Sequence, residues 1–150
     1  MAAIIDKEEK RQHLELIQNI ITRMNTNSFQ IKGMAITIVS ALLAIYASTA
    51  NVMFVFLSIA PTLLFWFLDS YYLQQERKFR GVYNNVCGLK NDVEIKPYEM
   101  PIQKFQGGQY CFCKVFWSKT IAWLYGSMVV LLLLGSLILK FKDCITINYK

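Results

Sequence analysis

Two long stretches without a charged residue dominate the chain. The first covers residues 33–68, which is 36 positions, and the second covers residues 120–139, which is 20 positions. A helix that crosses a membrane needs about 20 mainly apolar residues, so the first stretch has room for two spans and the second for one. The pattern predicts a transmembrane hairpin over residues 33–69 and a third transmembrane span over residues 120–140.

The first uncharged stretch must reverse direction, and its most polar part is the sequence ASTANV at residues 47–52. We therefore expect the first span near residues 33–48 and the second near residues 52–68. Pro61 lies inside the second span. Neighbouring groups or water can satisfy the carbonyl that a proline leaves without a donor. A local kink is therefore the simpler expectation, and a gating hinge is the alternative.

The segment before the hairpin, residues 1–32, has the spacing of an amphipathic helix. Its apolar positions recur at intervals of three or four residues, at Leu14, Ile17, Ile21 and Met24. The polar sequence NTNS at residues 25–28 is expected to end this helix and to cap the next one. The apolar stripe needs a partner, because an isolated helix is only marginally stable in water. The candidates are the membrane surface, a second copy of the chain and the continuation of the second span, which we prefer.

The second span meets no clear helix terminator before residue 86, so the sequence predicts one helix over residues 52–86. These 35 residues would extend about 52 Å, well beyond a hydrocarbon core of about 30 Å. We therefore expect residues 70–119 to form a cytoplasmic helical extension followed by a loop. The apolar face of the extension would consist of Tyr72, Phe79, Val82, Tyr83 and Val86.

The rest of the central segment is rich in turn formers, with Pro97, Pro101 and a pair of glycines at residues 107–108. The weakly alternating sequence DVEIKPY at residues 92–98 predicts a short strand, and so does the sequence CITINYK within the tail at residues 141–150. The aromatic sequence YCFCKVFW at residues 110–117 is expected at the membrane interface, directly before the third span.

The composition agrees with an all-α membrane protein, since 55% of the residues are hydrophobic and 17% are charged. Five lysines and arginines precede the first span, eight lie in residues 70–119, and none lies in the hairpin turn. Because cytoplasmic segments are enriched in Lys and Arg, the N-terminus and the central segment should be cytoplasmic, and the tail after three spans should lie outside. The net charge of +6 suits anionic lipids, and we do not interpret it as nucleic-acid binding.

The residues offer little support for an enzyme. The sequence contains no glycine-rich phosphate loop, nucleophile triad or metal motif. Cys111 and Cys113 lack the spacing of a zinc site, and we expect the four cysteines to be free thiols near the membrane. The single histidine, His13, lies beside the apolar stripe and is expected to serve a helix interface. We therefore expect no catalytic residue, no cofactor site and no metal site.

The charges that follow the second span are the candidates for coupling or assembly. Asp69 is expected at the boundary between lipid and water, where it can reach water and can also pair with Lys32 or Arg23. Glu76 and Arg80 are four residues apart, in the favourable order for an exposed ion pair on a helix.

Arg77 completes this candidate group, and with Lys78 and Arg80 it gives the helix a basic, solvated face. This face could hold a phosphate of a lipid or of a nucleotide. A structural charge network is one interpretation of the group, and a ligand-binding or gating role is the other. We predict that charge reversal at Arg77 and Arg80 disturbs assembly or triggering more than folding.

Three sequences carry a resemblance to known proteins. RMNTNSFQIKG leads into the first span, PTLLFWFLDSYYLQQERKFRGVY ends the second, and FWSKTIAWLYG opens the third. Together they resemble a group of small bacterial inner-membrane proteins. The order of an amphipathic helix and a two-span hairpin is similar to the SLATT-type membrane effectors of nucleotide-signalled anti-phage systems, and this chain adds a third span.

This resemblance implies a homo-oligomeric protein of the bacterial inner membrane that permeabilises or depolarises the membrane when triggered. It also implies that a cytoplasmic sensor or the small cytoplasmic part of the chain detects the trigger. Two other functions stay open: a membrane scaffold that anchors a cytoplasmic partner enzyme, and a small channel or transporter subunit.

Overall fold

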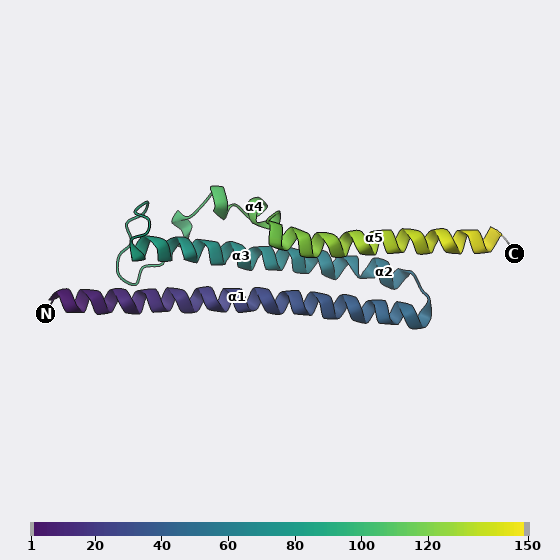
Figure 1. The fold of residues 1–150 in the computed structure, drawn as a ribbon, viewed down its shortest axis with the longest axis horizontal. Helices are drawn as coiled ribbons and strands as arrows, with labels where there is room; N and C mark the ends of the chain where they lie inside the picture. Colours follow the sequence, from purple (N-terminus) through teal and green to yellow (C-terminus); the bar gives the residue numbers. More distant parts are fainter. Residues whose placement is uncertain (1, 149–150) are drawn as a thin grey trace. The chain divides into compact units, whose positions relative to one another are not determined.

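The computed structural model describes the backbone of residues 2–148 and the side chains of residues 7–140. Within these residues the fold is all-helical and contains no strand. Figure 1 shows the elements in chain order, which are α1 (Ala2–Thr49), α2 (Met53–Leu57), α3 (Ile59–Cys87), the short 3-10 helices η1 (Ile102–Lys104) and η2 (Gly108–Tyr110), α4 (Phe112–Phe116) and α5 (Lys119–Asn148).

Three helical segments of the described chain are long and apolar enough to cross a membrane, judged by length and composition. They are Lys7–Thr49, Met53–Cys87 and Lys119–Lys140. Large apolar side chains such as Leu131 and Ile138 point away from the protein on these segments. A soluble protein would leave such a surface in water, whereas lipid accommodates it. The structure is thus consistent with a multi-pass membrane protein.

The first long helix does not end where the sequence predicts. α1 continues through residues 25–28, so the expected helix end and new cap at NTNS are wrong. The hydroxyl of Thr22 donates to the carbonyl of Gln18, and that of Thr26 donates to the carbonyl of Thr22. These side chains bond to their own helix instead of offering the backbone an alternative turn, and the helix therefore stays intact.

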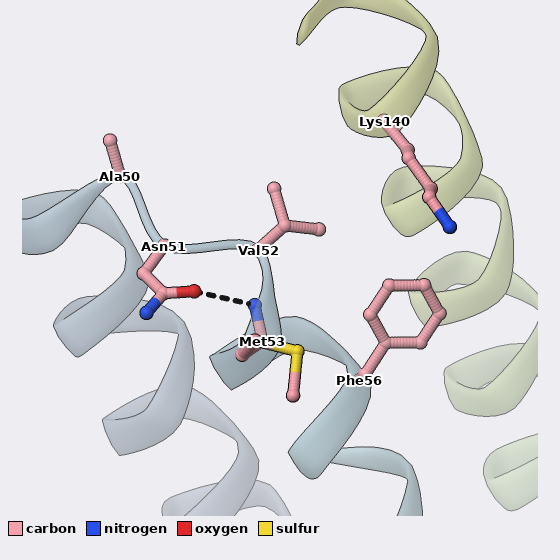
Figure 2. Close-up of a pocket in the computed structure, with 6 residues that line it drawn as sticks. All are labelled: Ala50, Asn51, Val52, Met53, Phe56 and Lys140. Atoms are coloured by element: carbon pink, nitrogen blue, oxygen red, sulfur yellow. Dashed lines mark hydrogen bonds between the residues drawn. The ribbon is translucent and has the colours of Figure 1, made fainter. Parts of the chain in front are cut away.

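The hairpin turn is confirmed inside the predicted segment and is tighter than expected. α1 ends at Thr49, and α2 begins at Met53. Ala50 adopts a left-handed backbone with φ of 54°. The side-chain oxygen of Asn51 accepts a hydrogen bond of 3.0 Å from the backbone N–H of Met53, which fixes the start of α2 (Figure 2). Figure 2 also shows Phe56 and Lys140 directed toward the space beside this turn.

The second span is not the single helix that we expected over residues 52–86. It is interrupted at Ser58, three residues before Pro61, and α3 then continues to Cys87. Proline has no N–H to donate to the carbonyl four residues earlier, which is that of Leu57. The hydroxyls of Ser58 and Thr62 donate to the carbonyls of Phe54 and Ser58, each at 2.8 Å. The expected local distortion near Pro61 is therefore present as a break in the helix.

The chain divides into two compact units, which we describe separately. Met1–Phe29 and Ser70–Val115 form the first, here called the charged unit. Gln30–Asp69 and Phe116–Lys150 form the second, here called the apolar unit. The boundaries fall within α1 and α3, and each of these helices continues from one unit into the other.

The core of the charged unit joins α1, α3 and the loop that follows α3. It consists of Ile17, Ile21, Val82 and Phe105, all buried. Phe79, Tyr83 and Val86 pack against it, which confirms α3 as the partner of the α1 stripe. Within that stripe Ile17 and Ile21 are buried, whereas Leu14 and Met24 are only half-buried.

Two predicted strands are wrong. Residues 92–98 form turns, in which the backbone N–H of Val93 donates to the side-chain oxygen of Asn85 at 3.0 Å. Val93 and Ile95 pack against the core of the charged unit instead of pairing with a second strand. In the tail, α5 continues to Asn148, so residues 144–148 are helical. Because Val93 and Ile95 contact a core made by two helices and a loop, residues 92–98 require no strand partner.

Gly81 lies where the loop crosses α3 at very close range. A Cβ atom at this position would be 2.7 Å from a ring carbon of Phe105 and 2.8 Å from the hydroxyl oxygen of Tyr110. Atoms of these types do not approach so closely, and the Phe105 ring is itself held in the core. Gly81 therefore permits the loop to pack on the helix.

We expect Gly81→Ala to destabilise the charged unit, even though alanine favours helices by up to about 1 kcal/mol over glycine. Overpacking of this kind costs about 1–3 kcal/mol, so the net loss should be small but measurable as a lower thermal midpoint in detergent. Gly33→Ala is the matched control, because a Cβ on this α1 glycine meets nothing within 4 Å. If both variants raised the midpoint equally, the close packing over Gly81 would be contradicted.

Candidate functional site

A buried ion pair lies in the apolar unit. The ammonium nitrogen of Lys32 on α1 is 2.7 Å from one carboxylate oxygen of Asp69 on α3 and 2.9 Å from the other. These two residues are the ones that immediately precede and follow the first uncharged stretch. The pairing of Asp69 with Lys32 that we considered is thus confirmed, and the pair joins the two arms of the hairpin.

The expected exposure of Asp69 is wrong. Its side chain is 0% exposed, and that of Lys32 is 24% exposed, so the carboxylate is covered by protein and does not reach water. A charge removed from water is costly unless it is paired and hydrogen-bonded. The net free energy that the ion pair contributes therefore depends on the geometry of the pair. The clearest effect of the ion pair is to select one register of α1 against α3.

A cluster of four aromatic rings lies in the apolar unit near the Lys32–Asp69 ion pair. Trp66, one helical turn before Asp69, stacks on Phe116 with ring centroids 4.6 Å apart, and its indole N–H donates to the Phe116 carbonyl at 3.1 Å. Trp117 packs edge-on to the Trp66 ring at 5.8 Å, and Tyr125 stacks at 6.2 Å. The start of α5 and the residues before it are therefore anchored to α3 beside the ion pair.

Tyr125 adds a hydroxyl to this site. The side chain is completely buried, and its hydroxyl lies close enough to the Asp69 carboxylate to interact with it electrostatically. It makes no well-formed hydrogen bond to another described residue. A buried hydroxyl without a well-formed hydrogen bond costs about 1–3 kcal/mol. The site thus combines a cation from α1, an anion from α3 and a buried hydroxyl from α5.

A second part of the apolar unit has an apolar core. Val39, Val55 and Leu132 form its core. The buried hydroxyl of Ser136 donates to the Leu133 carbonyl at 2.8 Å, and those of Ser58 and Thr62 donate to carbonyls four residues earlier. These three hydroxyls are thus satisfied by backbone carbonyls close in sequence.

The other predicted charges lie in the charged unit. Glu76 pairs with Arg80, as the spacing of four residues predicts. The expected solvation of this pair is wrong for Glu76, whose side chain is 9% exposed beside an Arg80 that is 61% exposed. Arg77 is half-buried, and one of its N–H groups donates to the Gln109 carbonyl at 3.2 Å. The loop at η2 therefore contacts the face of α3 that carries Arg77.

The structure therefore separates the four predicted coupling residues. Asp69 belongs to the apolar unit and pairs with Lys32, whereas Glu76, Arg77 and Arg80 belong to the charged unit. Sequence reasoning missed the contribution of Trp66 and Tyr125. One sequence feature indicated these two residues: aromatic residues are dense at the end of the second span and at the start of the third.

His13 and the cysteines are placed as follows. His13 is 2% exposed, and its ring centroid lies 5.9 Å from that of Tyr98, so it serves a protein interface as expected. Cys87, Cys111 and Cys113 are free thiols, and Cys144 lies outside the residues whose side chains are described. Among the described residues, no group of three or more His, Cys, Asp or Glu side chains is placed to hold a metal ion.

No family model, no curated protein and no solved structure matches this chain.

Proposed function

We propose that this chain is a homo-oligomeric effector of the bacterial inner membrane, which permeabilises or depolarises that membrane in anti-phage defence. The resemblance to SLATT-type effectors and the three apolar helices support this proposal. The distribution of lysine and arginine supports a cytoplasmic N-terminus and a cytoplasmic charged unit. The expected trigger acts on the charged unit or on a cytoplasmic partner of it.

The observation that carries the proposal is an uncovered small-residue surface on two spans. Shallow hollows lie over Gly33 and Thr37 on α1 and over Ala122 and Gly126 on α5. A Cβ added at Gly33 or Gly126 meets nothing within 4 Å. Small residues four apart let a second helix approach closely in lipid, where close packing drives association. These surfaces therefore fit further copies of the chain.

Conduction would require such copies. Val39, Val55 and Leu132 form a core of one apolar unit, and the buried hydroxyls of Ser58, Thr62 and Ser136 each donate to a carbonyl three or four residues earlier. A path for ions would then form between protomers, not through one protomer. Because α1 and α3 each pass from the charged unit into the apolar unit as one helix, a change in the first unit can act on the second.

We expect induced expression of the triggered protein to collapse the membrane potential, measured with a voltage-sensitive dye. Gly126→Leu should abolish both the collapse and the oligomers seen by crosslinking, because the larger side chain fills the hollow on α5. Ala60→Leu is the matched control, since Ala60 is an exposed small residue of α3 outside that hollow. Full membrane potential in induced cells with a demonstrably active trigger would disprove the proposal.

One observation favours the scaffold alternative. A surface pocket of about 320 Å³ in the charged unit is lined by Glu9, Lys10, His13 and Asn85, among others. The Nε2 atom of His13 is buried there and has no hydrogen-bond partner among the described residues. A partner protein that supplies a side chain to this pocket would satisfy it. Retention of a stable soluble enzyme in a pull-down, with no conductance in liposomes, would support the scaffold over the effector.

A further inference from the structure

A second pocket of the charged unit carries a concentrated positive charge. It has a volume of about 260 Å³ and is lined mainly by Arg77, Arg80, Asn84, Lys90, Gln109 and Tyr110. The two arginines lie on α3, Lys90 lies just beyond its end, and the last two residues come from the loop at η2. Three cations from residues 77–90 therefore meet at one hollow, which the loop at η2 closes with Gln109 and Tyr110.

The fold holds these cations in place. An N–H of the Arg77 guanidinium donates to the Gln109 carbonyl at 3.2 Å, which leaves its other donors available. The backbone N–H of Lys90 donates to the Asn84 carbonyl at 3.0 Å and so fixes the chain directly after α3. Both contacts bring the charges together through polar backbone groups, without a negative partner.

The charge at this pocket is only partly balanced. Glu76 pairs with Arg80, and it is the one carboxylate that contacts any of the three cations through an ion pair among the described residues. Arg77 and Arg80 are three apart on α3, a spacing at which like charges repel. An anion bound between these side chains would remove that repulsion and lower the free energy of the folded unit.

We propose that this pocket binds a phosphate group, carried either by a soluble ligand or by a lipid head group. Arginine offers a planar set of donors that matches phosphate oxygens, and lysine adds a point charge. A terminal phosphate presents up to two negative charges and three oxygens, which suits three cations better than a single carboxylate does. The amides of Asn84 and Gln109 supply further donors at the rim. Phosphate binding at this pocket does not depend on whether the protein permeabilises a membrane.

Binding to the detergent-solubilised full chain tests the proposal, with microscale thermophoresis as the measurement. Pyrophosphate is the probe for a soluble source, and dihexanoyl phosphatidic acid is the probe for a lipid source, with dihexanoylglycerol as its uncharged counterpart. Lys90→Gln should weaken binding roughly three- to tenfold, as expected for loss of one charged contact at an open site. Lys90 is exposed, and its side chain makes no ion pair with another described residue, so the variant should fold normally.

Lys96→Gln is the control, because it removes the same charge from an exposed lysine of the same unit outside the pocket. Arg77→Gln should weaken binding further than Lys90→Gln. Lys90-dependent binding of pyrophosphate would establish a soluble ligand, and Lys90-dependent binding of phosphatidic acid alone would establish a lipid. Absence of binding by both probes, or an equal loss in Lys96→Gln, would overturn the proposal.

Discussion

Asp69→Asn is expected to lower the free energy of unfolding in detergent micelles by about 3 kcal/mol, as is usual when one partner of a buried ion pair is removed. The variant leaves the Lys32 ammonium without its counter-charge at a position where only 24% of its side chain is exposed. Titration with a denaturing detergent, followed by circular dichroism, measures the loss. The same variant should also loosen the start of α5, because Tyr125 interacts with this carboxylate.

A double replacement separates the effect of charge from that of packing. Lys32→Met combined with Asp69→Leu should recover most of the lost stability, because apolar side chains of similar volume often replace a buried ion pair without loss. Glu8→Gln is the control for an exposed pair, since Glu8 and Arg11 are both largely in water and should contribute no measurable stability. If the double replacement were as unstable as Asp69→Asn, an uncompensated charge would not explain the loss.

Phe105→Ala is expected to have the second large effect, about 3–5 kcal/mol for the loss of a core aromatic side chain. Phe105 is 5% exposed, contacts the core made by Ile17, Ile21 and Val82, and lies directly over Gly81. Its removal should release the loop at residues 88–111 from α3. Hydrogen exchange of this loop, read by mass spectrometry in detergent, should therefore increase strongly, while the apolar unit keeps its protection.

Phe29→Ala provides the matched control, because Phe29 belongs to the same unit and is 76% exposed. It should leave exchange of residues 88–111 unchanged. Equal exchange in Phe105→Ala and the unmodified protein would show that Phe105 does not hold the loop. Exchange that rises equally in both units would contradict their separation into two compact bodies.

Charge distribution and hydropathy were sufficient to predict the helical segments able to cross a membrane. Residues 33–68 and 120–139 contain no charged residue and are mainly apolar, so no tertiary contact is needed to recognise them. The helix end at residues 25–28 was predicted wrongly from local polarity, because Thr22 and Thr26 satisfy their hydroxyls on α1 itself. The strand predicted at residues 92–98 was wrong, because apolar and polar residues also alternate in a short loop that packs on a core.

The candidate sites were predictable only in part. The spacing of Glu76 and Arg80 predicted their pair, and the position of Asp69 at the end of the apolar stretch marked it as unusual. The basic pocket could not be predicted from residues 77–80 alone. Lys90 and Gln109 reach it through a turn and a loop whose course depends on the packing of Phe105 and Tyr110 over Gly81.

The sequence by itself determined which segments avoid water, because transfer of apolar helices is a property summed over their residues and needs no partner. It also determined the stripe containing Ile17 and Ile21, through helical spacing. Only the tertiary structure decided that Asp69 is buried beside Lys32 and Tyr125 instead of reaching water. The burial of the Asp69 carboxylate depends on side chains that are far from it in sequence. The spacing of apolar and polar residues near Asp69 does not show which distant side chains will pack against it.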